Sequence, residues 1–146
     1  MKRILLPLSI ALFACHAGSA LADDASCKSG PHPLPAGYEG WSNPSPLNAA
    51  TQAGALSASR LTLGHAATIR LAHTPDVHFV ERPAEPGGSV SFSGMVAFEA
   101  PKDGTSRVML PNKTWIDVLH GTVPARSTHH PHGPDGSGIR QLVDVH

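Results

Sequence analysis

The chain of 146 residues is poor in charged, aromatic and cysteine side chains, and each shortage excludes a class of structure or function. Charged residues make up 15%, and the 11 Lys and Arg are balanced by 11 Asp and Glu, so the basic stripe of a nucleic-acid-binding protein is lacking. No apolar run is long enough to span a bilayer. The 14 glycines and 14 prolines disfavour long helices and favour short strands joined by turns. We therefore expect one small domain with no nucleic-acid partner and no transmembrane segment.

The amino terminus has the pattern of an export signal. Lys2 and Arg3 precede an apolar run over residues 4–14, which is too short to cross a membrane. Ala20-Leu21-Ala22 then supplies small residues for a cleavage site before Asp23. We expect residues 1–22 to be a signal peptide and the protein to be periplasmic or secreted.

The fate of the two cysteines depends on where the signal is cleaved. In a second interpretation of the signal, Leu12-Phe13-Ala14-Cys15 is a lipoprotein cleavage box, and Cys15 carries a lipid anchor. If cleavage instead occurs before Asp23, Cys27 is the one cysteine left. A single thiol in an oxidising compartment is either unpaired or bonded to another chain.

Two parts are expected after the signal. Residues 23–59 are rich in proline and alanine, which predicts an extended surface segment with a helical turn within 47–59. In this segment Tyr38 and Trp41 either anchor the chain to the domain or form an aromatic ligand platform. From residue 60 onward, hydrophobic and polar residues alternate with a period of two. This pattern predicts an all-β domain over residues 60–146, a small antiparallel β-sandwich of jelly-roll type.

The strongest strand pattern covers residues 90–100, and Gly94 at its middle indicates a bend. The turn at 102–104 predicts that residues 107–110 pair with this strand as a hairpin. Further strands are expected at 68–72, 77–80, 114–120 and 139–145.

Histidine is the one abundant reactive side chain. His129-His130-Pro131-His132 places three imidazoles within four residues, which is a ligand set suited to Zn²⁺, Cu²⁺ or Ni²⁺. A dedicated metal site also needs neighbouring groups that orient the rings, and Pro131 predicts an irregular loop. A solvated polar loop is therefore the alternative.

A second histidine pair has a sharper geometric basis. If residues 74–77 form a turn between two strands, His73 and His78 become cross-strand neighbours within reach of one metal ion. Asp76 would then orient one ring or act as a third ligand. The alternative is that both histidines lie on exposed strand faces.

The usual catalytic motifs are lacking. The chain has no Gly-x-Ser-x-Gly elbow, no phosphate-binding glycine loop and no glutamates with glycosidase spacing. The strand expected at 114–120 puts Asp117 on the same face as Trp115. Asp117 is then either a general acid tuned by the indole or a carboxylate paired with a neighbouring arginine. The motifs therefore assign no catalytic residue.

Several segments taken together resemble a family of small exported proteins from alphaproteobacteria. They are Gly40-Trp41, Glu81 to Gly87, Ser91 to Gly94, Trp115 to Val118, His130 to Pro134 and Ile139 to Val143. Members often carry the name homogentisate 1,2-dioxygenase, and that name implies an oxygenase that holds Fe²⁺ with two histidines and a glutamate. Relatives have a cysteine where Gly136 stands and continue beyond His146. The resemblance therefore implies an unpartnered Cys27 and a truncated carboxyl terminus.

Three hypotheses follow for the function. The leading one is a non-catalytic binding or accessory module of the periplasm, since a fold by itself does not specify a ligand. The first alternative is a metal-handling protein that uses the histidines named above. The second is the iron-dependent dioxygenase that the resemblance implies.

Overall fold

A computed structural model of the chain describes residues 33–100, 104–129 and 131–146, all within one compact unit, Pro31–His146. The expected signal peptide, Cys15, Cys27 and His130 lie outside the described residues. The strands are β1 (Ser45–Asn48), β2 (Ala67–Arg70), β3 (Ala72–His73), β4 (Phe92–Ser93), β5 (Ser106–Leu110), β6 (Leu119–His120), β7 (Val123–Pro124), β8 (Ser127–His129) and β9 (Gln141–Val145). Short 3₁₀ helices occupy Glu39–Ser42, Ala53–Ala58 and Thr74–Asp76. The expectation of a β-rich domain is confirmed.

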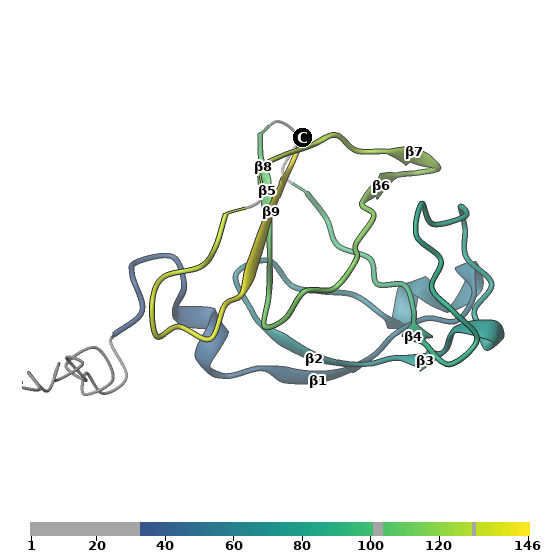
Figure 1. Ribbon diagram of the computed structural model, residues 1–146, viewed down its shortest axis with the longest axis horizontal. Helices are drawn as coiled ribbons and strands as arrows, with labels where there is room; N and C mark the ends of the chain where they lie inside the picture. Colours follow the sequence, from purple (N-terminus) through teal and green to yellow (C-terminus); the bar gives the residue numbers. More distant parts are fainter. Residues whose placement is uncertain (1–32, 101–103, 130) are drawn as a thin grey trace, which may run out of the picture. The chain divides into compact units, whose positions relative to one another are not determined.

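A three-stranded antiparallel sheet has the order β5-β9-β8 (Figure 1) and carries three of the six buried hydrophobic residues in the described part of the chain. Its central strand, β9, is buried on both faces. Leu142, Val143 and Val145 are each at most 5% exposed. A strand covered on both sides favours the middle of a sheet, because an edge position would leave its backbone groups unpaired. The predicted strand at 139–145 is therefore confirmed, with Ile139 buried just before it.

The predicted hairpin between residues 90–100 and 107–110 is wrong. β5 pairs with β9 instead, with Ser106 opposite Val145 and Leu110 opposite Gln141. In the 90–100 segment only β4 belongs to a ladder, and Met95 and Ala97 form isolated bridges to Ala50 and Arg60. The physical reason lies at Gly94, where a Cβ atom would stand 2.4 Å from the Cβ of Ala49. The chain bends at this close approach and so leaves the straight path that a long strand requires.

Two other predicted strands are also absent from the described residues. Residues 77–80 form no strand, because the amide of His78 donates to the carbonyl of Thr51 and the neighbouring residues form no ladder. In the segment 114–120 only β6 is regular, and it forms a small hairpin with β7. The alternation of hydrophobic and polar residues in these two segments is therefore not accompanied by continuous hydrogen bonding to a neighbouring strand.

Residues 33–59 contribute to the folded unit rather than preceding it. β1 runs parallel to β2, with Leu47 opposite Ile69, so the pairing in this domain is not purely antiparallel. Ala50 and Ser59 are buried, and their backbones bond to Met95 and Ala97. The helical turn expected within 47–59 is confirmed as the 3₁₀ helix Ala53–Ala58.

The aromatic side chains of this segment anchor it to the sheet. The indole Nε1–H of Trp41 donates to the carbonyl of Ser137 at 3.1 Å, and Arg107 donates to the hydroxyl of Tyr38 at 3.4 Å. Next to Trp41, a Cβ atom on Gly40 would stand 1.8 Å from the carbonyl oxygen of Gly64, so only glycine fits there. The anchoring interpretation of Tyr38 and Trp41 agrees with these contacts.

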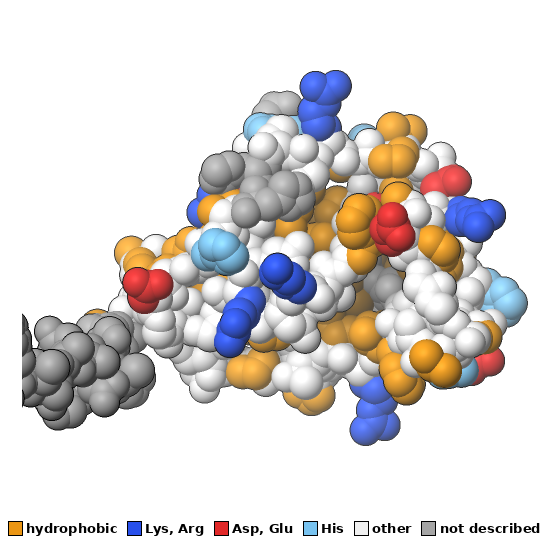
Figure 2. Space-filling model, in the orientation of Figure 1, with side chains coloured by type: hydrophobic (Ala, Val, Ile, Leu, Met, Phe, Trp, Pro, Cys, Tyr) orange, Lys and Arg blue, Asp and Glu red, His pale blue; other side chains and the backbone are white. Residues whose placement is uncertain are grey.

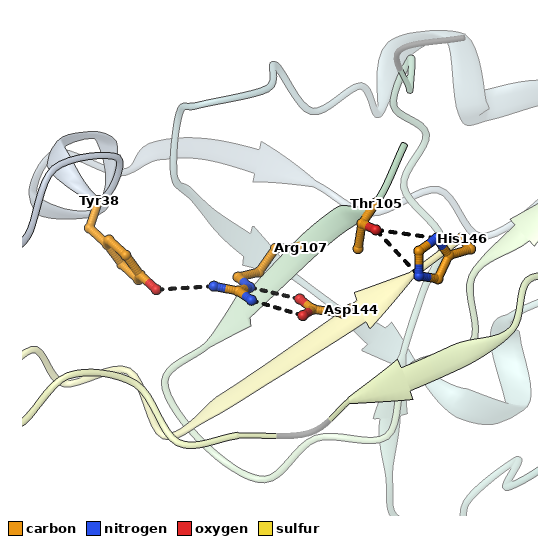
Figure 3. A network of polar contacts seen from close by, with 5 residues as sticks. All are labelled: Tyr38, Thr105, Arg107, Asp144 and His146. Carbon is orange, nitrogen blue, oxygen red and sulfur yellow. Dashed lines mark hydrogen bonds and ion pairs between the residues drawn. The ribbon is translucent and has the colours of Figure 1, made fainter. Parts of the chain in front are cut away.

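An ion pair crosses one face of the sheet (Figure 3). Arg107 on β5 donates to both carboxylate oxygens of Asp144 on β9, at 2.7 and 2.8 Å. The Asp144 side chain is 12% exposed and that of Arg107 is 46% exposed. The hydrogen bonds to Asp144 and to Tyr38 raise the pKa of the Arg107 guanidinium above its ordinary value. Through its bond to Tyr38, Arg107 also links the amino-terminal segment to the central strand β9.

Candidate functional site

Two cavities share Trp115 in their linings, and this residue is 59% exposed. The first, which we call the basic cleft, has a volume of about 410 Å³ and is lined by Lys113, Thr114, Trp115, Pro131, His132, Arg140 and Gln141. The second, which we call the apolar pocket, has a volume of about 280 Å³ and is lined by Thr114, Trp115, Ile116, Asp117, Val118, Pro124, Ala125, Ser127, Gln141, Val143 and Val145. Thr114, Trp115 and Gln141 line both cavities. Their sizes are those of small-molecule sites.

The sheet register brings the walls of the basic cleft together. Leu110 at the end of β5 lies opposite Gln141 at the start of β9. The turn after β5 and the approach to β9 therefore meet at the same end of the sheet, which places Lys113 beside Arg140. The amide of Thr114 donates to Oε1 of Gln141 at 3.2 Å and ties the segment after the turn to β9.

The basic cleft carries positive charge. Among the described residues its lining includes Lys113, Arg140 and His132 but no acidic side chain. Neither Lys113 nor Arg140 forms a side-chain hydrogen bond or an ion pair with another described residue. Figure 2 shows basic and histidine side chains gathered over the start of β9 and the turn after β5. Cations without partners in a concave site are suited to an anionic group.

His132 is held in the cleft by the backbone of the opposite wall. Its Nδ1 lies 3.2 Å from the carbonyl oxygen of Arg140. A carbonyl can only accept, so Nδ1 carries the proton of this bond and Nε2 is left for a ligand. His132 can then offer a lone pair at Nε2 when neutral or a second N–H when protonated.

The loop that carries His132 folds tightly over the buried side chain of Ile139. A Cβ atom on Gly133 would stand 2.5 Å from the Cβ of Ile139 and 2.6 Å from its carbonyl oxygen. The amide of Leu142 donates to the carbonyl of Pro131 at 3.0 Å, and Trp41 holds the carbonyl of Ser137. The amino-terminal segment and β9 thus both position this wall of the cleft.

Asp117 holds the exposed indole in place. The Nε1–H of Trp115 donates to one carboxylate oxygen of Asp117 at 3.2 Å, and the amide of Ala84 donates to the other at 3.0 Å. The pairing with an arginine that the sequence suggested as an alternative is not found among the described residues. Asp117 therefore acts on Trp115 as a positioning residue.

Comparisons with protein-family models, with curated proteins and with solved structures find no match to the chain. The chemistry of the site must therefore be derived from its own residues.

Of the two alternatives for His73 and His78, the cross-strand pair is not formed, and both residues are exposed. β3 pairs with β4, so the residue opposite His73 is Phe92, and the two rings meet edge to face with centroids 5.7 Å apart. After the 3₁₀ helix Thr74–Asp76, the amide of His78 turns to the carbonyl of Thr51. The reason is that residues 74–76 form a single helical turn, which does not return the chain alongside β3.

The histidine loop is described in part. The backbone of His129 ends β8, His130 lies outside the described residues, and His132 lines the basic cleft. Residues 33–100, 104–129 and 131–146 contain no group of three or more His, Cys, Asp or Glu side chains placed to hold a metal ion. The two histidines and a glutamate that the resemblance implies are thus not brought together in this part of the chain. Nor does any helix in it have the length and apolar character needed to cross a membrane.

Proposed function

We propose that the protein is an exported, non-catalytic binding module of the bacterial envelope whose ligand site is the basic cleft with Trp115. The observation that carries this proposal is the exposed Trp115, whose indole donates to Asp117 and which lines both the cation-lined cleft and the apolar pocket. A large exposed aromatic side chain in a concave site is typical of ligand recognition, because it supplies rigid contact area at little entropic cost. The small sheets would then belong to an accessory β-sandwich of jelly-roll type.

Export is supported by the pattern of residues 1–22, and it predicts the amino terminus of the mature protein. Protein recovered from the periplasmic or secreted fraction is expected to begin at Asp23. Intact mass measurement on each cell fraction tests this expectation. A lipid-modified chain beginning at Cys15 would establish the anchored form, and a full-length cytosolic chain would contradict export.

Ligand binding is expected to depend on Trp115. In calorimetric titrations with glucose, glucuronate, benzoate and octanoate, at least one compound should bind the mature protein. Trp115→Ala should weaken that binding at least tenfold, because Trp115 is the one aromatic side chain among the three residues that line both cavities. Phe92→Ala is the matched control, since Phe92 is a 65% exposed aromatic residue that lines neither cavity. Binding by none of the four compounds, or equal loss in both variants, would contradict the proposal.

A metal-handling function is the second candidate, and one observation favours it. The contact between Nδ1 of His132 and the carbonyl of Arg140 orients the ring in the way that metal-ligating histidines are commonly held. Submicromolar binding of Zn²⁺ or Cu²⁺ that is lost when His129, His130 and His132 are all replaced by alanine would support this candidate. Millimolar binding that survives the replacements would dismiss it.

A further inference from the structure

We propose that the ligand of the Trp115 site is an anionic amphiphile, that is, an acidic headgroup joined to an apolar chain or ring. The inference rests on the proposed binding function and names the chemical class of its ligand. It depends on the contrast between the two cavities and on the fact that Trp115 lines both of them.

The basic cleft suits the acidic headgroup. Lys113 and Arg140 supply N–H donors around it, and in the described part of the chain no carboxylate lines it. An arginine and a lysine bind a carboxylate, sulfonate or phosphate through charge-assisted hydrogen bonds. Because these side chains are exposed, each is expected to strengthen binding only threefold to tenfold.

The apolar pocket suits the hydrocarbon. Its apolar walls include Ile116, Val118, Val143 and Val145, of which the two β9 valines are buried core residues, and they stand beside the polar residues Thr114, Asp117, Ser127 and Gln141. Each methylene group that moves from water into such a pocket strengthens binding about fourfold. Because Trp115 lines both cavities, the headgroup and the hydrocarbon both contact this residue.

Asp117 determines the direction in which the ligand lies. It is the one charged residue among the described lining of the apolar pocket, and its carboxylate is held there by the N–H groups of Trp115 and Ala84. A fixed negative charge repels an anion from the apolar pocket. The headgroup is therefore directed to the basic cleft and the hydrocarbon to the apolar pocket.

Calorimetric titration of the mature protein with octanoate, butyrate and octan-1-ol tests the inference. Octanoate is expected to bind at least tenfold more tightly than butyrate, which lacks most of the hydrocarbon, and at least tenfold more tightly than octan-1-ol, which lacks the charge. Butyrate binding as well as octanoate would show a site for small anions, and octan-1-ol binding as well would show a purely apolar site. Either result would contradict the proposal that the ligand is an anionic amphiphile.

Variants assign the two halves of the ligand to the two cavities. Lys113→Gln and Arg140→Gln should each weaken octanoate binding threefold to tenfold and leave octan-1-ol binding unchanged. Arg70→Gln, at an exposed arginine that lines neither cavity, is the matched control and should change neither. Val118→Thr keeps the side-chain shape and should weaken octanoate about threefold without affecting butyrate. Octanoate binding that is insensitive to Lys113, Arg140 and Val118 would place the ligand elsewhere and overturn the inference.

The failure of this inference is distinguishable from that of the proposed function. If glucose binds in a Trp115-dependent manner and neither octanoate nor benzoate does, the ligand class is wrong and the binding function stands. If none of the compounds binds, both the ligand class and the proposed binding function are contradicted. A free fatty acid and an acidic lipid share the proposed chemistry, so competition between octanoate and lysophosphatidylglycerol identifies which source the site accepts.

Discussion

Gly133→Ala is expected to lower the free energy of unfolding by about 2 kcal/mol and to weaken ligand binding at the same time. The new methyl group would stand 2.5 Å from the Cβ of Ile139 and 2.6 Å from its carbonyl oxygen, and both are too close for a Cβ atom. Ile139 is only 5% exposed and cannot move outward without opening the core. The wall of the basic cleft that carries His132 must therefore shift.

The matched control for this prediction is Gly54→Ala. Gly54 lies in the 3₁₀ helix Ala53–Ala58, and a Cβ atom there would meet nothing within 4 Å. Alanine at this position should leave stability unchanged or raise it slightly, because it restricts the unfolded chain. Thermal or denaturant unfolding followed by circular dichroism measures both variants. Equal stability of Gly133→Ala and the parent protein would show that the loop does not pack on Ile139 as described.

Arg107→Met is expected to lower the free energy of unfolding by about 2 kcal/mol. The substitution removes two charge-assisted hydrogen bonds to the carboxylate of Asp144, which is buried at the centre of the sheet, and the bond to Tyr38. Breaking a fully buried pair costs about 3–5 kcal/mol, and the smaller figure follows because the Arg107 side chain is 46% exposed. Methionine keeps most of the aliphatic length, so the measured loss reports mainly on the polar contacts.

A second ion pair in the same protein provides the control. Arg60 and Glu99 also form a salt bridge, but their side chains are 49% and 87% exposed. Arg60→Met should therefore cost less than about 1 kcal/mol. If the two substitutions cost the same, the burial of Asp144 does not strengthen the Arg107 pair.

The pH dependence of the Arg107 contribution follows from the direction of its pKa shift. The folded protein raises the pKa of this guanidinium, so the stabilisation is fully present below the ordinary pKa of arginine in the unfolded chain. It is lost only as the pH rises through the still higher pKa of the folded state. The difference in free energy of unfolding between the parent protein and Arg107→Met should accordingly be the same at pH 7 and pH 9.

Much of the β-rich character is predictable from local pattern, and the pairing of the strands is not. β9 is recognisable because its apolar residues are dense enough to mark a strand without reference to its neighbours. The choice of β5 as the partner of β9 depends on contacts between residues more than 30 positions apart, which no turn signal encodes. Residues 90–100 show the opposite case, because their clear alternation is interrupted by the approach of Gly94 to Ala49.

The candidate site was predictable only in part. Trp115 and Asp117 stand out in the sequence as an aromatic residue and an acid two positions apart. Lys113 and Arg140 carry no motif, and they meet because the β5–β9 register brings Leu110 opposite Gln141. His132 stands out as one of three histidines within four residues, but its place beside Arg140 depends on the fold of the loop over Ile139. Sequence patterns therefore identify reactive side chains, whereas the sheet register determines which of them share a cavity.

The most direct test of the central claim is the response of the two indole Nε1–H resonances in a ¹H–¹⁵N correlation spectrum during titration with octanoate. The Trp115 resonance should move progressively and saturate, because Trp115 lines both cavities and its N–H group donates to Asp117, which lines the apolar pocket. The Trp41 resonance should stay in place, because its N–H group is committed to the carbonyl of Ser137. A stationary Trp115 resonance at saturating octanoate, or a shift confined to Trp41, would contradict the assignment of the ligand site.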